Sequence, residues 1–280
     1  MKDLRDKIVF VTGASSGIGR SCVRAFAAGG AKIMMCARRP DRLESLAAEL
    51  DRDFQVPSHR FSLDVRDRRA VAEAVEGLPA GWQAIEVLVN NAGLSRGLDK
   101  LQEGLIDDWE EMIDTNIKGL LYVSRAVLPG MVRRSSGHVI NIGSIAGYEV
   151  YPGGNVYCAT KFAVRALSRA LRMDLLGSPV RVSEIAPGMV ETEFSFVRFH
   201  GDAERADKVY KGLVPLSPDD IAEAAVWCAT RPPHVNVSEM IVMPTAQASA
   251  TMAAYPGTEN PPISFAAWMS WRRQASSTSG

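Results

Sequence analysis

The stretch that decides the fold is Lys7-Ile8-Val9-Phe10-Val11-Thr12, which runs directly into Gly13-Ala14-Ser15-Ser16-Gly17-Ile18-Gly19. The first part is short and apolar, as in a buried parallel strand, and a helical pattern continues from Arg20 to about Ala28. A glycine-rich turn between strand and helix lets the backbone approach a pyrophosphate, which the helix N-terminus also attracts. The spacing is G-x-x-x-G-x-G rather than G-x-G-x-x-G, so a turn used only for packing remains an alternative.

The next strand indicates which nucleotide the turn would hold. Residues 32–36 are apolar after the first position and lead into Ala37-Arg38-Arg39. A free ribose 2′-hydroxyl is usually met here by Asp or Glu, whereas arginine suits a 2′-phosphate by its charge and its fork of donors. The sequence therefore favours NADP(H) over NAD(H). The alternative is that Arg38 and Arg39 form a solvated turn before Pro40.

Tyr157 and Lys161 carry the candidate chemistry. They are four residues apart, with Ser144 thirteen residues upstream, and positions i and i+4 share one face of a helix. A tyrosine has a pKa of about 10, and a neighbouring cation favours the phenolate. We expect Lys161 to lower this pKa toward about 7, a differential stabilisation of roughly 4 kcal/mol. Such a tyrosine could exchange a proton with a carbonyl or an alcohol.

Alternating strand and helix patterns predict one doubly wound, Rossmann-like α/β domain over residues 1–245. The domain would hold a seven-stranded parallel sheet, a lid at about 190–217, and long helices at 109–130 and 155–176. Residues 246–280 are rich in Ala, Ser, Thr and Pro and are interpreted as a partly mobile tail, with Phe265, Trp268 and Trp271 expected to dock on the domain or a neighbouring subunit. The strands are expected at 7–12, 32–37, 59–63, 85–90, 138–143, 180–186 and 239–243.

Composition excludes several classes of protein. The 32 basic and 32 acidic residues balance, which does not suggest a nucleic-acid surface. The cysteines and histidines, four of each, lack metal-ligand spacing, so no metal site is expected. No stretch approaches ~18 apolar residues, and the N-terminus lacks the pattern of a signal peptide. We therefore expect a cytoplasmic protein that does not span a membrane.

Four blocks, taken together in this order, resemble the short-chain dehydrogenase/reductase family. They are Thr12 to Gly19, Asn90-Asn91-Ala92-Gly93, Ser144, and Tyr157-x-x-x-Lys161. Pro187-Gly188 is a fifth match, and Asn116 completes the family's Asn-Ser-Tyr-Lys set. The resemblance covers roughly residues 5–245 and implies a homotetramer built through the helices at 109–130 and 155–176.

The resemblance also implies a role for each matching residue. Tyr157 would be the acid/base, Lys161 would hold the nicotinamide ribose, and Ser144 would bind the substrate oxygen. Asn116 would kink its helix and hold a water of the proton relay. Asp64 would contact the adenine, Asn90 the adenosine ribose, and Thr192 the nicotinamide amide; Asp64 as a cap and Thr192 as an ordinary loop residue remain alternatives. The full cofactor set is Gly13, Ser15, Ser16, Gly17, Ile18, Gly19, Arg38, Arg39, Asp64, Val65, Asn91, Ala92, Gly93, Tyr157, Lys161, Pro187, Gly188, Val190 and Thr192.

A narrower resemblance links the chain to bacterial NADP-dependent 3-hydroxy acid dehydrogenases, which act on serine and related acids. Close relatives of these enzymes reduce sulfoacetaldehyde to isethionate. The blocks that carry this resemblance include 89–97, 109–119, 151–157 and 190–194. One departure is Gly147-Tyr148-Glu149-Val150, where a tryptophan-proline pair is expected just before Tyr151. Because this segment should border the substrate, the substrate stays open.

The segment expected as a lid supplies a candidate group for binding the substrate. Arg198 could bind a carboxylate or sulfonate bidentately, and Tyr148, Tyr151 and Gln247 are weaker candidates; an exposed Arg198 is the alternative. These residues predict an NADP(H)-dependent oxidoreductase for a small anionic hydroxy acid and its aldehyde or keto form. Sulfoacetaldehyde reduction is one alternative, and a non-catalytic NADP(H) sensor is another.

Overall fold

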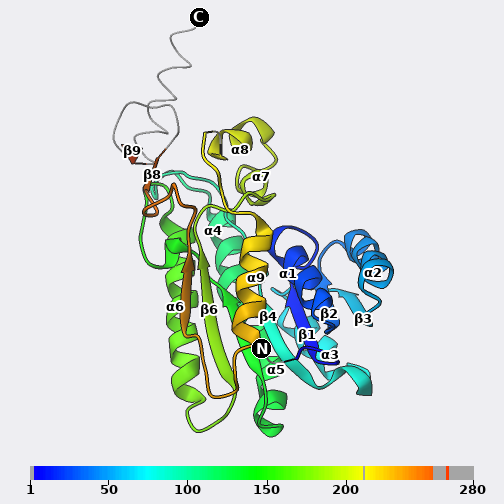
Figure 1. Ribbon diagram of the computed structural model, residues 1–280. Helices are drawn as coiled ribbons and strands as arrows, with labels where there is room; N and C mark the ends of the chain where they lie inside the picture. Colours follow the sequence, from blue (N-terminus) through cyan, green and yellow to red (C-terminus); the bar gives the residue numbers. More distant parts are fainter. Residues whose placement is uncertain (1–2, 211, 255–262, 265–280) are drawn as a thin grey trace, which may run out of the picture.

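The computed structural model describes residues 3–210, 212–254 and 263–264. Its centre is a parallel sheet of seven strands in the order β3-β2-β1-β4-β5-β6-β7 (Figure 1). The predicted fold class is confirmed, and each predicted strand agrees with an observed one to within one residue at either end. The strands are β1 (Ile8–Thr12), β2 (Lys32–Ala37), β3 (Ser58–Ser62), β4 (Ile85–Asn90), β5 (His138–Ile142), β6 (Arg181–Pro187) and β7 (Glu239–Val242).

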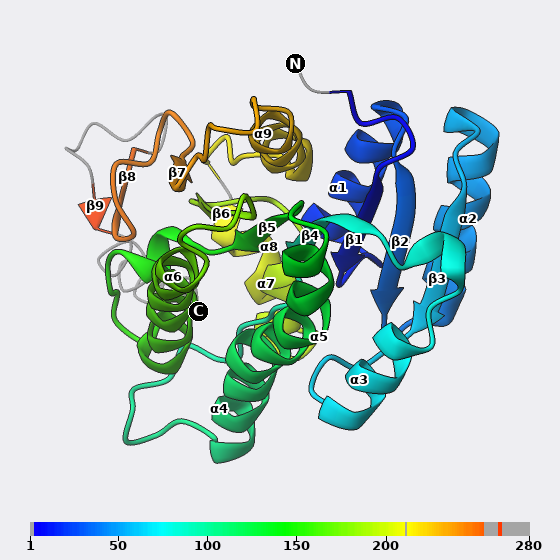
Figure 2. The same ribbon diagram turned by 90° about the horizontal axis from the view of Figure 1, so that it is seen from below.

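Helices cover both faces of this sheet, as Figure 2 shows. Successive side chains of a strand point to opposite faces, so β1, which is apolar from Ile8 to Val11, can supply both cores. Val9 and Val11 belong to the apolar core on one face of the sheet, whereas Ile8 and Phe10 belong to the core on the other face. One face thus carries α1 (Gly17–Ala28), α2 (Pro40–Phe54) and α9 (Pro218–Ala229); the other carries α3 (Arg68–Glu76), α4 (Ile106–Ile113), α5 (Leu120–Arg133) and α6 (Asn155–Asp174).

The strand order reverses between β1 and β4. Chain connections leave the sheet in opposite directions at this point, which opens a crevice at the carboxyl ends of the two strands. Gly13 follows β1 and Asn91 follows β4, so both predicted motifs meet at this crevice.

The helix predicted at 109–130 is present but interrupted. The α-helices α4 and α5 flank η2 (Asp114–Gly119), which is π-helical and contains Asn116. Such π segments are rare and frequently occur at functional sites. The helix predicted at 155–176 is α6, which ends at Asp174.

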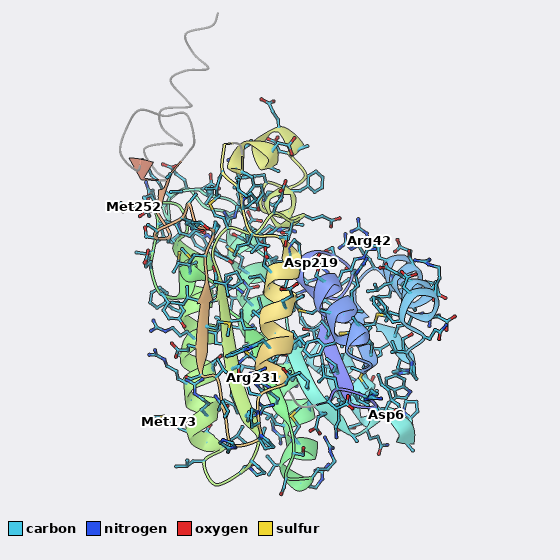
Figure 3. The ribbon with its side chains drawn as sticks, viewed as in Figure 1. Asp6, Arg42, Met173, Asp219, Arg231 and Met252 are labelled. Carbon is cyan, nitrogen blue, oxygen red and sulfur yellow. The ribbon has the colours of Figure 1, made fainter. Side chains whose placement is uncertain are left out.

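The predicted lid segment folds into α7 (Phe194–Arg198) and α8 (Ala203–Tyr210) above the carboxyl edge of the sheet (Figure 1). The two ends of this segment are joined by a backbone hydrogen bond of 2.9 Å from Leu216 N to Met189 O. The segment then enters α9, whose N-terminus is held by a capping box between Ser217 and Asp220. Figure 3 shows Asp219 and Arg231 at the two ends of α9, each placed favourably for the helix dipole.

The first residues of the segment predicted as a tail pack on the domain. Gln247 is buried and accepts a hydrogen bond of 2.8 Å from Met189 N, and Ala250 N donates to Glu149 Oε2 at 2.8 Å. Two short strands follow, β8 (Met252–Ala253) and β9 (Ile263–Ser264). The aromatic residues expected to dock lie outside the described residues.

Candidate active site

A pocket of about 420 Å³ lies at the carboxyl edge of the sheet and is lined in part by α7 and α8. It gathers most of the residues that the sequence singles out. From the candidate cofactor set it is lined by Gly13, Ser15, Ser16, Gly17, Ile18, Arg38, Arg39, Asp64, Val65, Asn91, Ala92, Gly93, Tyr157, Lys161, Pro187, Gly188, Val190 and Thr192. From the candidate substrate set it is lined by Ser144, Tyr151, Arg198 and Gln247.

The glycine-rich turn has the shape of a phosphate cradle. Gly13 and Gly17 have φ angles of +65° and +50°, a conformation that glycine adopts without strain. Gly19 does not line the pocket, and a Cβ there would overlap the Asn91 side chain and the Gly13 carbonyl. The glycines therefore let the turn close on Asn91 while the N-terminus of α1 faces the pocket, which fits a pyrophosphate.

The two predicted phosphate-binding arginines lie at the rim of this turn. Arg39 donates to Ser15 Oγ at 3.0 Å and to Ser16 Oγ at 2.9 Å, and it pairs with Glu193 at 3.2 Å. Arg38 pairs with Glu111 at 3.4 Å. Both guanidinium groups are about half-exposed beside the pocket, so they could hold a 2′-phosphate.

Asp64 follows β3 and lines the pocket, but its carboxylate is already bonded. It accepts from the backbone N–H of Arg66 at 3.0 Å and from the Arg66 Nη2 at 2.6 Å. The residue therefore caps its own turn, as the alternative interpretation expected, while facing the predicted adenine region.

Ser144 and Tyr157 approach one another from different elements. Ser144 follows β5 and caps the short helix η3 (Ile145–Gly147), accepting from Ala146 N at 3.1 Å. Tyr157 lies in the first turn of α6, where its side chain is 8% exposed and is hydrogen bonded to Ser144. The two hydroxyl groups thus face one another in the wall of the pocket.

Lys161 lies one turn further along α6. Its Nζ donates to Ile142 O at 3.0 Å and is 5.9 Å from the centre of the Tyr157 ring. Burial lowers the pKa of Lys161 to about 8, an effect that the charge of Glu184 partly opposes. The shared helix face is confirmed, but the ammonium is bonded to a carbonyl rather than to the phenol.

The pKa of Tyr157 is raised, contrary to the expectation from the i, i+4 spacing. Burial is the main cause and Tyr151 adds to it, while the charge of Arg198 and the bond to Ser144 act in the opposite direction. Desolvation disfavours the phenolate, and Lys161 does not overcome it. The phenol therefore stays protonated at neutral pH.

Asn116 is buried behind the pocket rather than in its wall. Its Oδ1 accepts from Leu94 N at 2.8 Å, and its Nδ2 donates to Leu94 O at 2.8 Å and to Thr160 Oγ1 at 3.0 Å. The side chain therefore ties the segment after β4 to α6. The helix irregularity expected at Asn116 is present, and its water stays a prediction.

Arg198 is a charged group that lies over the ring of Tyr157. It is buried at 8% exposure and lies 5.4 Å from the centre of the Tyr157 ring. Its Nε donates to Ser95 Oγ and its Nη2 to Tyr151 Oη, both at 3.1 Å. The alternative of an exposed Arg198 is wrong, because the lid helix turns this side chain inward. Ser95 and Phe194, which also contact this group or its tyrosine, were not predicted.

Two predicted residues point elsewhere. Tyr148, a substrate candidate, is absent from the lining of this pocket; its hydroxyl donates to Glu239 at 2.9 Å and its ring is covered by Arg165. Asn90, expected at the adenosine ribose, is buried within the domain, where its Nδ2 donates to Ser124 Oγ and Asn141 Oδ1 at 2.9 Å. The alternation of β4 directs Asn90 toward α5, and only the next residue reaches the crevice.

Known proteins resemble this chain along most of its length. The sequence profile of the short chain dehydrogenase family matches residues 7–201. The chain belongs to this family. An NADP-dependent 3-hydroxy acid dehydrogenase of Salmonella typhi is 50% identical over 249 residues, covering 89% of this chain and 99% of the relative. One from Schizosaccharomyces pombe is 43% identical over 251 residues, covering 89% and 97%.

A solved structure agrees closely with the fold of this family member. The closed form of a serine dehydrogenase complexed with NADP+ is 47% identical and superimposes with a TM-score of 0.82, covering 91% of this chain and 99% of that one. An alcohol dehydrogenase of Thermococcus sibiricus complexed with 5-hydroxy-NADP, 31% identical, gives a TM-score of 0.76 over 87% of this chain and 99% of its own.

The described ranges contain no group of three or more His, Cys, Asp or Glu side chains that could hold a metal ion. The helices found there are also too short or too polar to cross a membrane. Burial raises the pKa of Cys22 and of Cys36 to about 12, so both buried thiols stay protonated.

Proposed function

We propose that this short-chain dehydrogenase uses NADP(H) to interconvert a small anionic 3-hydroxy acid and its aldehyde or keto form. The observation that carries the proposal is the convergence of Ser144, Tyr157 and Arg198 in one pocket beside the glycine-rich turn. The relatives at 50% and 43% identity are named as NADP-dependent 3-hydroxy acid dehydrogenases, and a serine dehydrogenase similar in structure holds NADP+. Arg38 and Arg39 at the rim support the same cofactor.

The protein residues would divide the work of carbonyl reduction. Bound NADPH would supply the hydride to the carbonyl carbon. Ser144 would donate a hydrogen bond to the carbonyl oxygen and stabilise the charge that develops there. Tyr157, kept protonated by burial, would transfer its proton to that oxygen. Lys161 would hold the nicotinamide ribose, and its positive charge would stabilise the phenolate left on Tyr157 after the proton transfer.

Arg198 would select the substrate. Its guanidinium is preorganised by Ser95 and Tyr151, and within the described residues its Nη1 has no hydrogen-bond partner. It lies on the Tyr157 side of the pocket, so a carboxylate bound there would leave the far end of a short chain near the phenol. A buried cation in this position favours an anionic substrate over a neutral one.

The proposal is tested by following NADPH oxidation with malonic semialdehyde, sulfoacetaldehyde and a neutral aldehyde in parallel. Malonic semialdehyde should give the highest kcat/KM. Sulfoacetaldehyde, the alternative, is also a short anion that Arg198 could bind, and a preference for it would reassign the substrate. NADPH binding without turnover of any of the three would favour the non-catalytic sensor.

We also propose that the family's homotetramer forms here. Large apolar side chains are exposed on the helices expected to make the contacts: Ile106, Ile113 and Leu121 on α4 and α5, and Phe162 and Met173 on α6. Exposed apolar patches of this kind mark interaction surfaces. Light scattering on the purified chain should give four times the monomer mass, and a monomer in solution would contradict the proposal.

A further inference from the structure

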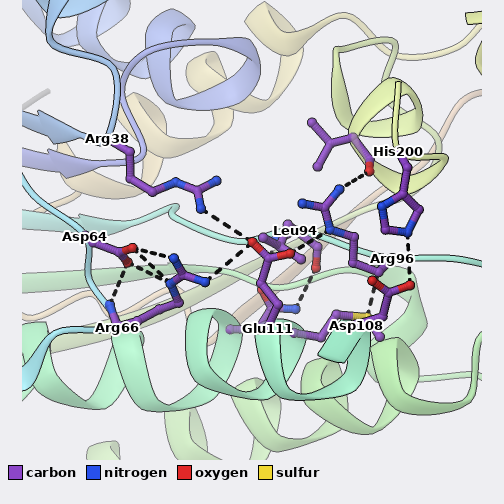
Figure 4. A network of polar contacts seen from close by, with 11 residues as sticks. Arg38, Asp64, Arg66, Leu94, Arg96, Asp108, Glu111 and His200 are labelled. Carbon is purple, nitrogen blue, oxygen red and sulfur yellow. Dashed lines mark hydrogen bonds and ion pairs between the residues drawn. The ribbon is translucent and has the colours of Figure 1, made fainter. Parts of the chain in front are cut away.

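Three arginines from different segments converge on Glu111 in α4 (Figure 4). Arg38 Nη1 lies 3.4 Å from Glu111 Oε1, and Arg66 Nη1 lies 3.6 Å from the same oxygen. Arg96 Nε lies 2.7 Å from Oε2. The Glu111 side chain is 19% exposed, so one partly buried carboxylate is shared among three cations.

The arginines on either side of Glu111 have different roles. Arg38 follows β2, lines the nucleotide end of the pocket and is 52% exposed. Arg96 is only 18% exposed, and its Nη1 donates to Val197 O of the lid helix α7 at 2.5 Å. The next residue, Gly97, donates its N–H to Arg198 O at 2.9 Å. Glu111 therefore connects the cofactor rim to the lid segment that carries the substrate clamp.

We propose that Glu111 is a positioning residue that couples recognition of the cofactor's 2′-phosphate to the placement of α7 over the substrate. The inference rests on the proposed NADP(H)-dependent function. Without a phosphate, Arg38 attracts the Glu111 carboxylate in competition with Arg96. A 2′-phosphate bound by Arg38 offsets its charge, and the carboxylate then acts mainly on Arg66 and Arg96. Arg96 is thereby held more firmly where it donates to Val197.

NADH lacks the 2′-phosphate, so with NADH bound Arg38 would still compete with Arg96 for the Glu111 carboxylate. The protein should consequently bind its substrate more tightly with NADPH than with NADH. Ion pairs of partly exposed groups are weak, and their loss changes an equilibrium by about two- to fivefold. Because coupling between two sites is reciprocal, this is also the factor by which substrate would tighten the preference for NADPH.

A second contact between α4 and the lid provides a control. His200 Nε2 lies 3.0 Å from Asp108 Oδ2 (Figure 4), and this pair shares none of the three arginines. Asp108→Asn should loosen the lid with either cofactor, whereas Glu111→Gln should affect the difference between them. Glu110, exposed on the same helix, gives a matched change of charge in Glu110→Gln.

The experiment measures the substrate KM with saturating NADPH and with saturating NADH for these variants. The ratio of the NADH value to the NADPH value should be about two to five in the unmodified protein. It should fall to about one in Glu111→Gln and stay unchanged in Glu110→Gln. Asp108→Asn should raise both KM values and keep the ratio. Arg96→Met, which breaks the same connection at its other end, should behave as Glu111→Gln and serves if that variant does not fold.

A readout without turnover separates this inference from the proposed substrate. Amide hydrogen exchange of residues 194–198 should be slowed more by NADPH than by NADH in the unmodified protein, and equally by both in Glu111→Gln. If no tested substrate is turned over but this pattern is seen, the proposed substrate fails and the coupling stands. A cofactor difference that survives unchanged in both Glu111→Gln and Arg96→Met would overturn the coupling.

Discussion

Replacing Arg198 with methionine isolates the charge of the proposed substrate clamp. Methionine keeps much of the apolar stem that packs near Phe194, where the guanidinium lies 4.9 Å from the ring centre. It removes a cation that is 8% exposed and is oriented by Ser95 and Tyr151. A hydrogen bond to a charged group contributes about 1.5–3 kcal/mol. The loss should therefore lower kcat/KM for an anionic substrate about 10- to 150-fold.

The assay compares malonic semialdehyde with an uncharged aldehyde of similar length, with NADPH saturating. For the uncharged aldehyde kcat/KM should change by less than about threefold, because no charged hydrogen bond is lost. Arg205→Met is the matched control, since Arg205 is exposed on the lid and its guanidinium covers Phe199 at 4.4 Å. Equal losses on both substrates would refute the clamp and leave Arg198 as a residue that only shapes the lid.

Three further outcomes are expected. Tyr157→Phe should lower kcat about 10²- to 10⁴-fold while fluorescence titration shows NADPH binding retained. Arg39→Gln should reduce kcat/KM for NADPH about tenfold or more, with little change for NADH, because a charged hydrogen bond to phosphate is lost. Burial raises the pKa of Glu184 from 4.5 to about 7, so the folded protein keeps a proton that the unfolded chain loses, and stability falls as pH rises through this window. The melting temperature of Glu184→Gln should therefore match the unmodified protein at pH 5 and exceed it at pH 8.

The sheet could be predicted from sequence because its signals are local. Each strand is a short apolar run between polar turns, and the doubly wound order follows from alternation with helices. The glycine-rich turn could also be predicted from the sequence, because it needs backbone angles that few residues other than glycine adopt. The strands and the turn can therefore be recognised without knowing which distant side chains they contact.

Residues that act through distant partners were harder to place. Tyr148 and Tyr151 are three residues apart, yet only Tyr151 lines the pocket. The direction of Tyr148 is set by Glu239 on β7 and Arg165 on α6, both far away in the sequence. Ser95 follows the Asn90 to Gly93 block by two positions, which is a usable signal for the loop but not for its bond to Arg198.

The protonation of Tyr157 shows the same limit most clearly. The i, i+4 spacing places Lys161 on the correct helix face, and proximity to a cation alone would lower the phenol pKa. Two features of the structure cannot be read from the spacing: the phenol is buried, and the carbonyl of Ile142 accepts a hydrogen bond from the ammonium. Because burial dominates, the pair holds a proton ready for a carbonyl oxygen more readily than it removes one from an alcohol. Reduction should therefore use the protonated phenol at neutral pH, whereas oxidation of the hydroxy acid needs the phenolate and should accelerate as the pH rises.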